Sequence, residues 1–208
     1  MGLKTKGLKV KKKWYVVISI VILLPVLLGI LLFGDKGIVL SGTPTLAIET
    51  PQRVSIKDTK EITLDMTISS LGNALYPAAS MSISFDPSRL EFLGIEEGNV
   101  FIRNGEGGVP QKLPEWSFNP DQCNKTGAIN IMYLDTTGGK NAFSKELLAE
   151  EYNVVLRLKF RLRGSVRTGD ICDLIFEDAV FAASDEKESL AMNRNTLKVK
   201  NSKIVVGE

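Results

Sequence analysis

The strongest constraint on the fold is a strand, a tight corner and a second strand between Ala78 and Gly98. Four apolar residues alternate there with three serines: Ala79, Met81, Ile83 and Phe85 against Ser80, Ser82 and Ser84. This alternation is typical of a β-strand with one buried and one exposed face. The Asp86-Pro87-Ser88 sequence then ends the strand, because proline lacks an N–H and aspartate bonds its own turn. The segment therefore predicts a β-sandwich with a flat exposed surface on which another protein can dock.

Strand patterns recur along the rest of the chain. They cover residues 45–50, 61–69, 78–85, 90–95, 116–118, 127–134, 152–164, 170–181 and 196–206. Apolar residues on both sides of 127–134 indicate a central strand, and the cations of 152–164 indicate a solvated, edge-protecting face rather than a binding stripe. Ser144 is a candidate N-cap for one or two helical turns up to Glu151. The patterns predict an all-β, nine-stranded antiparallel β-sandwich.

The N-terminal residues predict a membrane anchor. Residues 1–13 hold six lysines and no acid, and residues 14–33 hold no charge. Twenty apolar residues span about 30 Å as a helix, which matches the bilayer core, and the lysines place the N-terminus in the cytoplasm. We expect a single-pass cell-membrane protein with a linker at 34–44 and an extracellular domain at 45–208. The alternative is a cleaved secretory signal, although no A-x-A site follows the apolar run.

The linker predicts that the folded domain stays close to the membrane. Its eleven residues, GDKGIVLSGTP, reach at most about 35 to 40 Å when fully extended. A partner bound to the domain would therefore be held within some tens of ångströms of the bilayer.

Charge and composition exclude several function classes. The chain carries +2 overall, but the first 33 residues carry +6, which leaves 20 basic and 24 acidic residues in the exterior part. Nucleic acid is therefore not an expected partner, because a protein surface that binds nucleic acid requires clustered cations on the folded domain. The chain has no histidine, no G-x-S-x-G motif and no C-x-x-C pair. Catalysis and a protein-bound metal are accordingly not expected.

The two cysteines, Cys123 and Cys172, lie 49 residues apart. Outside the cell they could pair in a disulfide that closes a long loop, which would stabilise the folded state by about 3 to 4 kcal/mol. They could also be unrelated thiols. We favour unpaired thiols, because Cys172 follows a strand pattern and Cys123 lies in a polar segment that reads as a loop.

Four segments in this order resemble the cohesin domain, the module that binds dockerins in cellulosomes and related surface assemblies. They are SISFDPSRLEFLGIEEG, GAINIMYLDTTGG, VVLRLKFRLRG and IFEDAVFAASDE. The resemblance implies a jelly-roll sandwich in which the sheet formed by the third, fifth, sixth and eighth strands receives the dockerin helices. The helical turns at Ser144 resemble the helix that type II cohesins place between their sixth and seventh strands.

The resemblance also implies a set of partner-binding residues. They are Ala78, Ser80 and Ser82 on the third strand, Phe118 and Asn119 on the fifth, Asn130, Met132, Leu134, Asp135 and Gly138 on and after the sixth, and the loop from Asp185 to Leu190 after the eighth. Many type I cohesins carry asparagine and aspartate where this chain has Ala78 and Ser80, so the specificity of binding is open. Asp135 and Gly138 agree with an acid and a glycine used at that edge.

The expected function is recruitment of dockerin-bearing proteins to the cell surface. Met132 and Leu134 would supply apolar contact, and Asp135 would accept hydrogen bonds from a lysine or arginine of the partner. Calcium would belong to the dockerin, because this chain lacks a D-x-[DN]-x-[DN]-G series, and no cofactor is expected here. One alternative is a carbohydrate-binding module that stacks a polysaccharide on Trp116 and Phe118. Another is a structural surface β-sandwich.

Overall fold

The computed structural model describes residues 42–49, 51, 53–57, 61–100, 116–148, 150–184 and 191–208. The expected cytoplasmic tail, the membrane segment 14–33 and nearly all of the linker lie outside these residues. None of the helices within the described ranges is long and apolar enough to cross a membrane.

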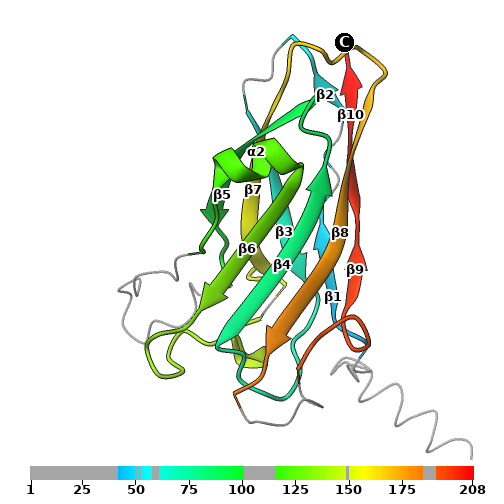
Figure 1. Cartoon of the computed structure of the whole chain (residues 1–208). Helices are drawn as coiled ribbons and strands as arrows, with labels where there is room; N and C mark the ends of the chain where they lie inside the picture. The colour runs from blue at the N-terminus through cyan, green and yellow to red at the C-terminus, as the bar shows by residue number, and fades with distance from the viewer. Residues whose placement is uncertain are drawn as a thin grey trace, which may run out of the picture. The chain divides into compact units, whose positions relative to one another are not determined.

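Two five-stranded sheets face each other (Figure 1). One sheet has the order β5-β7-β3-β1-β9, with β1 at Thr45–Ile48, β3 at Ile62–Ile68, β5 at Leu90–Glu97, β7 at Val154–Leu162 and β9 at Lys198–Lys200. The other has the order β2-β10-β8-β4-β6, with β2 at Val54–Ser55, β4 at Ala78–Phe85, β6 at Ala128–Leu134, β8 at Ile171–Ala182 and β10 at Ser202–Gly207. The β-sandwich expectation is confirmed.

The expected count of nine strands is wrong, because the residues that the structure describes form ten. The segment 196–206 divides at Asn201 into β9 and β10, which belong to different sheets, and the Asn201 side chain accepts a hydrogen bond from the Phe176 N–H at 2.9 Å. Near the N-terminus the chain likewise changes sheets between β1 and β2. The strand expected at 116–118 is reduced to a single bridge between Ser117 and Met132.

The pairing is mostly but not wholly antiparallel. β1 pairs in parallel with β9, and β2 pairs in parallel with β10, whereas the other strand pairs are antiparallel. Each sheet therefore joins a strand from the start of the domain to one from its end. β6 is the last strand of its sheet and not a central one, which corrects the expectation drawn from its apolar residues on both faces.

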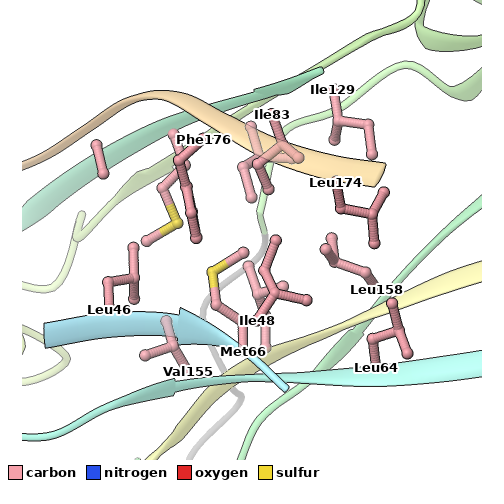
Figure 2. Close-up of a cluster of buried hydrophobic side chains, with 14 of the residues drawn as sticks. Leu46, Ile48, Leu64, Met66, Ile83, Ile129, Val155, Leu158, Leu174 and Phe176 are labelled. Carbon is pink, nitrogen blue, oxygen red and sulfur yellow. The ribbon is translucent and has the colours of Figure 1, made fainter. Parts of the chain in front are cut away.

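The core lies between the two sheets (Figure 2). One layer of side chains comes from β1, β3 and β7, including Leu46, Met66 and Leu158, and the facing layer comes from β4, β6 and β8, including Ile83 and Leu174. Full burial of each such side chain stabilises the fold by about 1.5 to 3 kcal/mol. Because alternate residues of β4 are committed to this core, its serines must face outward.

A short helix, α2 (Pro120–Thr126), replaces the polar loop expected around Cys123. The Asn119 side chain caps it by accepting from the Gln122 N–H, Pro120 opens the first turn, and Gly127 ends it in the left-handed region at φ 71°. The helical turns expected from Ser144 are a single 3-10 turn, η2 (Lys145–Leu147), with Ser144 at its N-cap position.

Both cysteines are free and buried, so the expectation of unpaired thiols is confirmed. Cys123 nevertheless lies on α2 and not in a loop. Cys172 lies on β8, where burial raises the pKa of its thiol.

The cations of β7 pair with carboxylates on the neighbouring strands or directly beside them. Arg157 contacts Asp65 at 2.9 Å, and Lys159 contacts Glu61 at 2.6 Å and Glu96 at 2.8 Å. Hydrogen bonds to these two glutamates raise the pKa of Lys159. β7 lies inside its sheet, so its cations do not protect a sheet edge, and that part of the expectation is wrong. Their pairing with carboxylates agrees with the expectation that this face is not a binding stripe.

Candidate functional site

The outward surface of β4, β6 and β8 brings together six of the residues expected to bind a partner and three of their neighbours on β8. We call this surface the β4–β6–β8 face, defined by Ala78, Ser80 and Ser82 on β4, Asn130, Met132 and Leu134 on β6, and Asp178, Val180 and Ala182 on β8. The three strands are adjacent in the sheet (Figure 1). None of these nine side chains belongs to the buried core.

The pairing register arranges these residues in three rows across the sheet. Ala78 lies between Leu134 and Ala182, Ser80 between Met132 and Val180, and Ser82 between Asn130 and Asp178. The smallest side chains are therefore on the middle strand in every row except the first, where β8 also carries alanine. The Ser82 hydroxyl donates to the Asn130 Oδ1 atom at 2.9 Å and links two strands of the face.

A shallow hollow of about 530 Å³ opens on this face. Six of the expected binding residues contribute to its lining: Ser80, Ser82, Phe118, Asn119, Asn130 and Met132. The wall also includes Ser117 and Asp178, which the sequence interpretation did not select. The hollow is thus bounded by hydroxyl and amide groups, one carboxylate and four apolar residues, Met81, Phe118, Ile131 and Met132.

Two large apolar side chains stand out from β6. Met132 is 55% exposed and Leu134 is 61% exposed, and they are two residues apart on one face of the strand. Leu75 is also exposed. It lies beside the loop that follows β6, because one of its methyl carbons would be 4.0 Å from a Cβ atom added to Gly139. Grouped exposed apolar side chains mark interaction surfaces more often than isolated ones do.

The opposite flank of the face is acidic. Glu177 and Asp178 are consecutive, both are exposed, and the register of β8 against β4 shifts at this point. A bulge in β8 explains why two successive carboxylates point outward. The Ser84 hydroxyl donates to Glu177 at 2.6 Å, and the highly exposed Arg194 guanidinium is 4.0 Å from Asp178.

Asp135 organises the loop after β6. Its carboxylate accepts from the Thr137 N–H at 2.8 Å, the Thr137 hydroxyl at 2.5 Å and the Gly139 N–H at 2.7 Å. Burial acts to raise the pKa of Asp135, but these hydrogen bonds outweigh it and the net pKa is lowered. Gly138 is exposed and has φ 76°, a backbone conformation that favours glycine. Both residues therefore shape the end of the face.

The two aromatic residues considered for sugar stacking, Trp116 and Phe118, differ in their exposure to solvent. Trp116 is 8% exposed and packs on Tyr133, with ring centroids 5.4 Å apart, and on Phe143. Phe118 is 37% exposed and meets Phe92 edge to face. Asn119 is exposed, but its side chain already caps α2. The row that stacking requires therefore has one accessible ring.

Two expected binding residues, Asp185 and Leu190, lie outside the described residues. Of the two polar lining residues that the sequence interpretation did not select, Asp178 could have been recognised from the sequence. Two successive acids, Glu177 and Asp178, interrupt an otherwise alternating strand, and such an interruption is the pattern of a bulge. Ser117 had no such signal, since its position depends on a single bridge to β6.

No family model and no curated protein matches the sequence. Solved structures do match. The third cohesin of ScaC from Acetivibrio cellulolyticus, in complex with the ScaB dockerin, aligns with TM-score 0.55 at 14% identity, over 79% of this chain and 99% of that one. A type I cohesin–dockerin complex from Clostridium thermocellum, Coh-OlpA-Doc918, aligns with TM-score 0.54 at 16% identity, over 79% and 99%.

The chain has the cohesin fold. A third cohesin, the non-cellulosomal one from the hyperthermophilic archaeon Archaeoglobus fulgidus, aligns with TM-score 0.50 at 11% identity, over 80% of this chain and 93% of that one. The first two of these cohesins were solved in complex with dockerins. Within the described residues no group of three or more His, Cys, Asp or Glu side chains could hold a metal ion.

Proposed function

We propose that the chain is a membrane-anchored receptor whose β4–β6–β8 face binds dockerin-bearing proteins outside the cell. One observation carries the proposal: Met132 and Leu134 are exposed beside a strand of small residues, at a shallow hollow lined by both polar and apolar residues. Solved cohesins of the same fold, some of them in complex with dockerins, support it.

The dimensions of the face suit a helix. Adjacent strands are about 4.8 Å apart, so β6 and β8 are separated by about 10 Å across β4. An α-helix with its side chains is about 10 Å wide. A helix laid along β4 would therefore rest on Ala78, Ser80 and Ser82 while its two sides meet β6 and β8.

The two flanks differ in chemistry and so give the partner helix a preferred orientation. Met132 and Leu134 on β6 would take apolar side chains, and Met132 can adapt its shape because it is unbranched. Glu177 and Asp178 on β8 would attract lysine or arginine. Arg194 compensates only part of this charge, because its guanidinium is 4.0 Å from Asp178 and highly exposed.

The anchor and the extracellular location rest on the sequence alone. Six lysines precede twenty uncharged residues, and the domain follows within a short linker. Together with the proposed binding, this arrangement would hold a captured protein near the outer surface of the membrane.

Sugar stacking is the weaker alternative. It would use Trp116 and Phe118 together, and Trp116 is buried against Tyr133 and Phe143. Phe118 alone offers a single ring, which is partly covered by Phe92.

Calorimetric titration of the purified full chain with calcium-loaded dockerin modules from the source organism tests the proposal. We expect saturable one-to-one binding to at least one dockerin, lost when a chelator removes calcium from the dockerin. Absence of binding to every dockerin would contradict it. Retention on a polysaccharide column would then favour a carbohydrate-binding module, and no retention would favour a structural role.

A further inference from the structure

Met132 differs from the other methionines that the structure describes. Its side chain is 55% exposed, whereas Met66, Met81 and Met192 are 0%, 3% and 3% exposed and belong to the core. A thioether is oxidised where an oxidant can reach it, so the fold protects these three and leaves Met132 open to attack.

The position of Met132 makes its chemical state important for the β4–β6–β8 face. It stands opposite Ser80 in the middle row, it contributes to the wall of the hollow, and it is followed on the same side of β6 by Leu134. The Met132 backbone is fixed separately, because its N–H donates to the Ser117 carbonyl at 3.1 Å and its carbonyl accepts from the Ser117 N–H at 2.7 Å. A change at the sulfur atom therefore alters the surface without disturbing the strand.

We propose that Met132 is a modification site at which oxidation by a hydroperoxide weakens partner binding; this consequence rests on the proposed function. A sulfur lone pair attacks one peroxide oxygen, an S–O bond forms and the O–O bond breaks. The oxygen bonded to sulfur gives up its proton, and the departing hydroxide takes up a proton and leaves as water when the oxidant is hydrogen peroxide. The sulfur is oxidised by two electrons, the peroxide is reduced by two, and the product is methionine sulfoxide.

The sulfoxide changes what this part of the face can bind. It converts a flexible apolar side chain into a polar, chiral one with a strong acceptor oxygen. When a partner covers the apolar flank, that oxygen loses its water without gaining a donor from the neighbouring Leu134. One such unpaired polar group weakens binding by about 10- to 100-fold.

The test exposes the folded full chain to increasing hydrogen peroxide and measures two quantities in each sample. Peptide mass spectrometry reports oxidation at each methionine, and titration with a calcium-loaded dockerin reports affinity. The control variant is Met132→Leu, which keeps an apolar side chain of similar volume but has no sulfur. A second variant, Met132→Gln, places a polar side chain at this position without peroxide.

We expect oxidation at Met132 while Met66, Met81 and Met192 remain thioethers, with a parallel loss of affinity in the wild-type chain. Met132→Leu should have the same affinity before and after peroxide treatment, because it has no sulfur to oxidise, and Met132→Gln should bind weakly from the start. Oxidation of Met132 no faster than of the buried methionines overturns the assignment of the site. Unchanged affinity after complete oxidation of Met132 overturns its effect on binding. Selective oxidation in a chain that binds no dockerin at all contradicts the proposed function and supports the site.

Discussion

At the scale of single residues, Asn124 shows how one side chain joins two elements. Its Oδ1 atom accepts from the Phe92 N–H at 2.8 Å, and its amide nitrogen donates to the carbonyls of Phe92 at 2.8 Å and Pro120 at 3.0 Å. β5, which contains Phe92, is an outermost strand of its sheet. Asn124 therefore satisfies backbone groups at the edge of β5 that no neighbouring strand pairs with, and it holds α2 against that edge.

Replacing this side chain tests its role. Asn124→Ala leaves the backbone groups of Phe92 without these partners, and we expect the free energy of unfolding to fall by about 1 to 3 kcal/mol. Urea denaturation measures the change. The matched control is Gln122→Ala, at an exposed position of the same helix, for which we expect a change within about 0.5 kcal/mol. Equal stabilities of the two variants would show that Asn124 does not hold α2 in place.

At the scale of elements, the loop after β6 depends on an ionised carboxylate. Folding lowers the pKa of Asp135 below its ordinary value of 3.8. The hydrogen bonds from Thr137 and Gly139 stabilise the charged carboxylate by more than burial destabilises it. The folded state is thus stabilised when Asp135 is charged. This stabilisation is complete above the unfolded pKa and is lost as the pH falls through the lower folded pKa.

We therefore expect urea unfolding midpoints of the wild-type chain to decrease between about pH 5 and pH 2, partly through Asp135. Asp135→Asn should be less stable at neutral pH and should show a smaller decrease over the same range. Glu150→Gln, at an exposed turn, is the control and should follow the wild-type slope. An identical slope in Asp135→Asn would mean that the carboxylate does not stabilise the loop.

The strands that alternate strictly could be predicted from the sequence, and several other elements could not. β4 was predicted because its serines leave only one way to bury Met81 and Ile83. β6 was predicted as a strand but placed centrally, because exposed Met132 and Leu134 look like core residues when a binding face is not considered. Its edge position depends on long-range pairing that no local pattern encodes. For α2, the cap signals of Asn119, Pro120 and Gly127 were present, but five of its seven residues are polar, and such a segment is also typical of a loop.

The candidate face was predictable to the extent that it follows strand alternation. Ser80, Ser82, Asn130 and Met132 line one hollow because two strands with matching outward residues pair side by side. Asp178 joins them through a bulge in β8, whose register only the structure gives. Asn119 and Asp135 were selected as binding residues, and the structure adds local roles for both, a helix cap and a loop anchor.

At the scale of the whole domain, the two sheets differ in how their outer surfaces are charged. The outward cations of β7 are paired with acids of β3 and β5, as Arg157 and Lys159 show. On the β4–β6–β8 face the defining residues are small, apolar or acidic, with one amide at Asn130, and none of them is a cation. The charged groups on the outer surface at β7 are therefore largely paired within the chain. The β4–β6–β8 face is the surface that we propose binds a partner.

The most direct test compares the same substitution on the two sheets. Leu134→Asp places a charge on the β4–β6–β8 face, and Val199→Asp, at a position 45% exposed on β9, places it on the other sheet. Titration with a calcium-loaded dockerin measures the affinity of each variant, and thermal unfolding confirms that both remain folded. We expect Leu134→Asp to lose about 2 kcal/mol or more of binding free energy, about 30-fold in affinity, and Val199→Asp to bind within about twofold of the wild-type chain. Equal binding by both variants, or loss of binding only in Val199→Asp, would contradict binding through the β4–β6–β8 face.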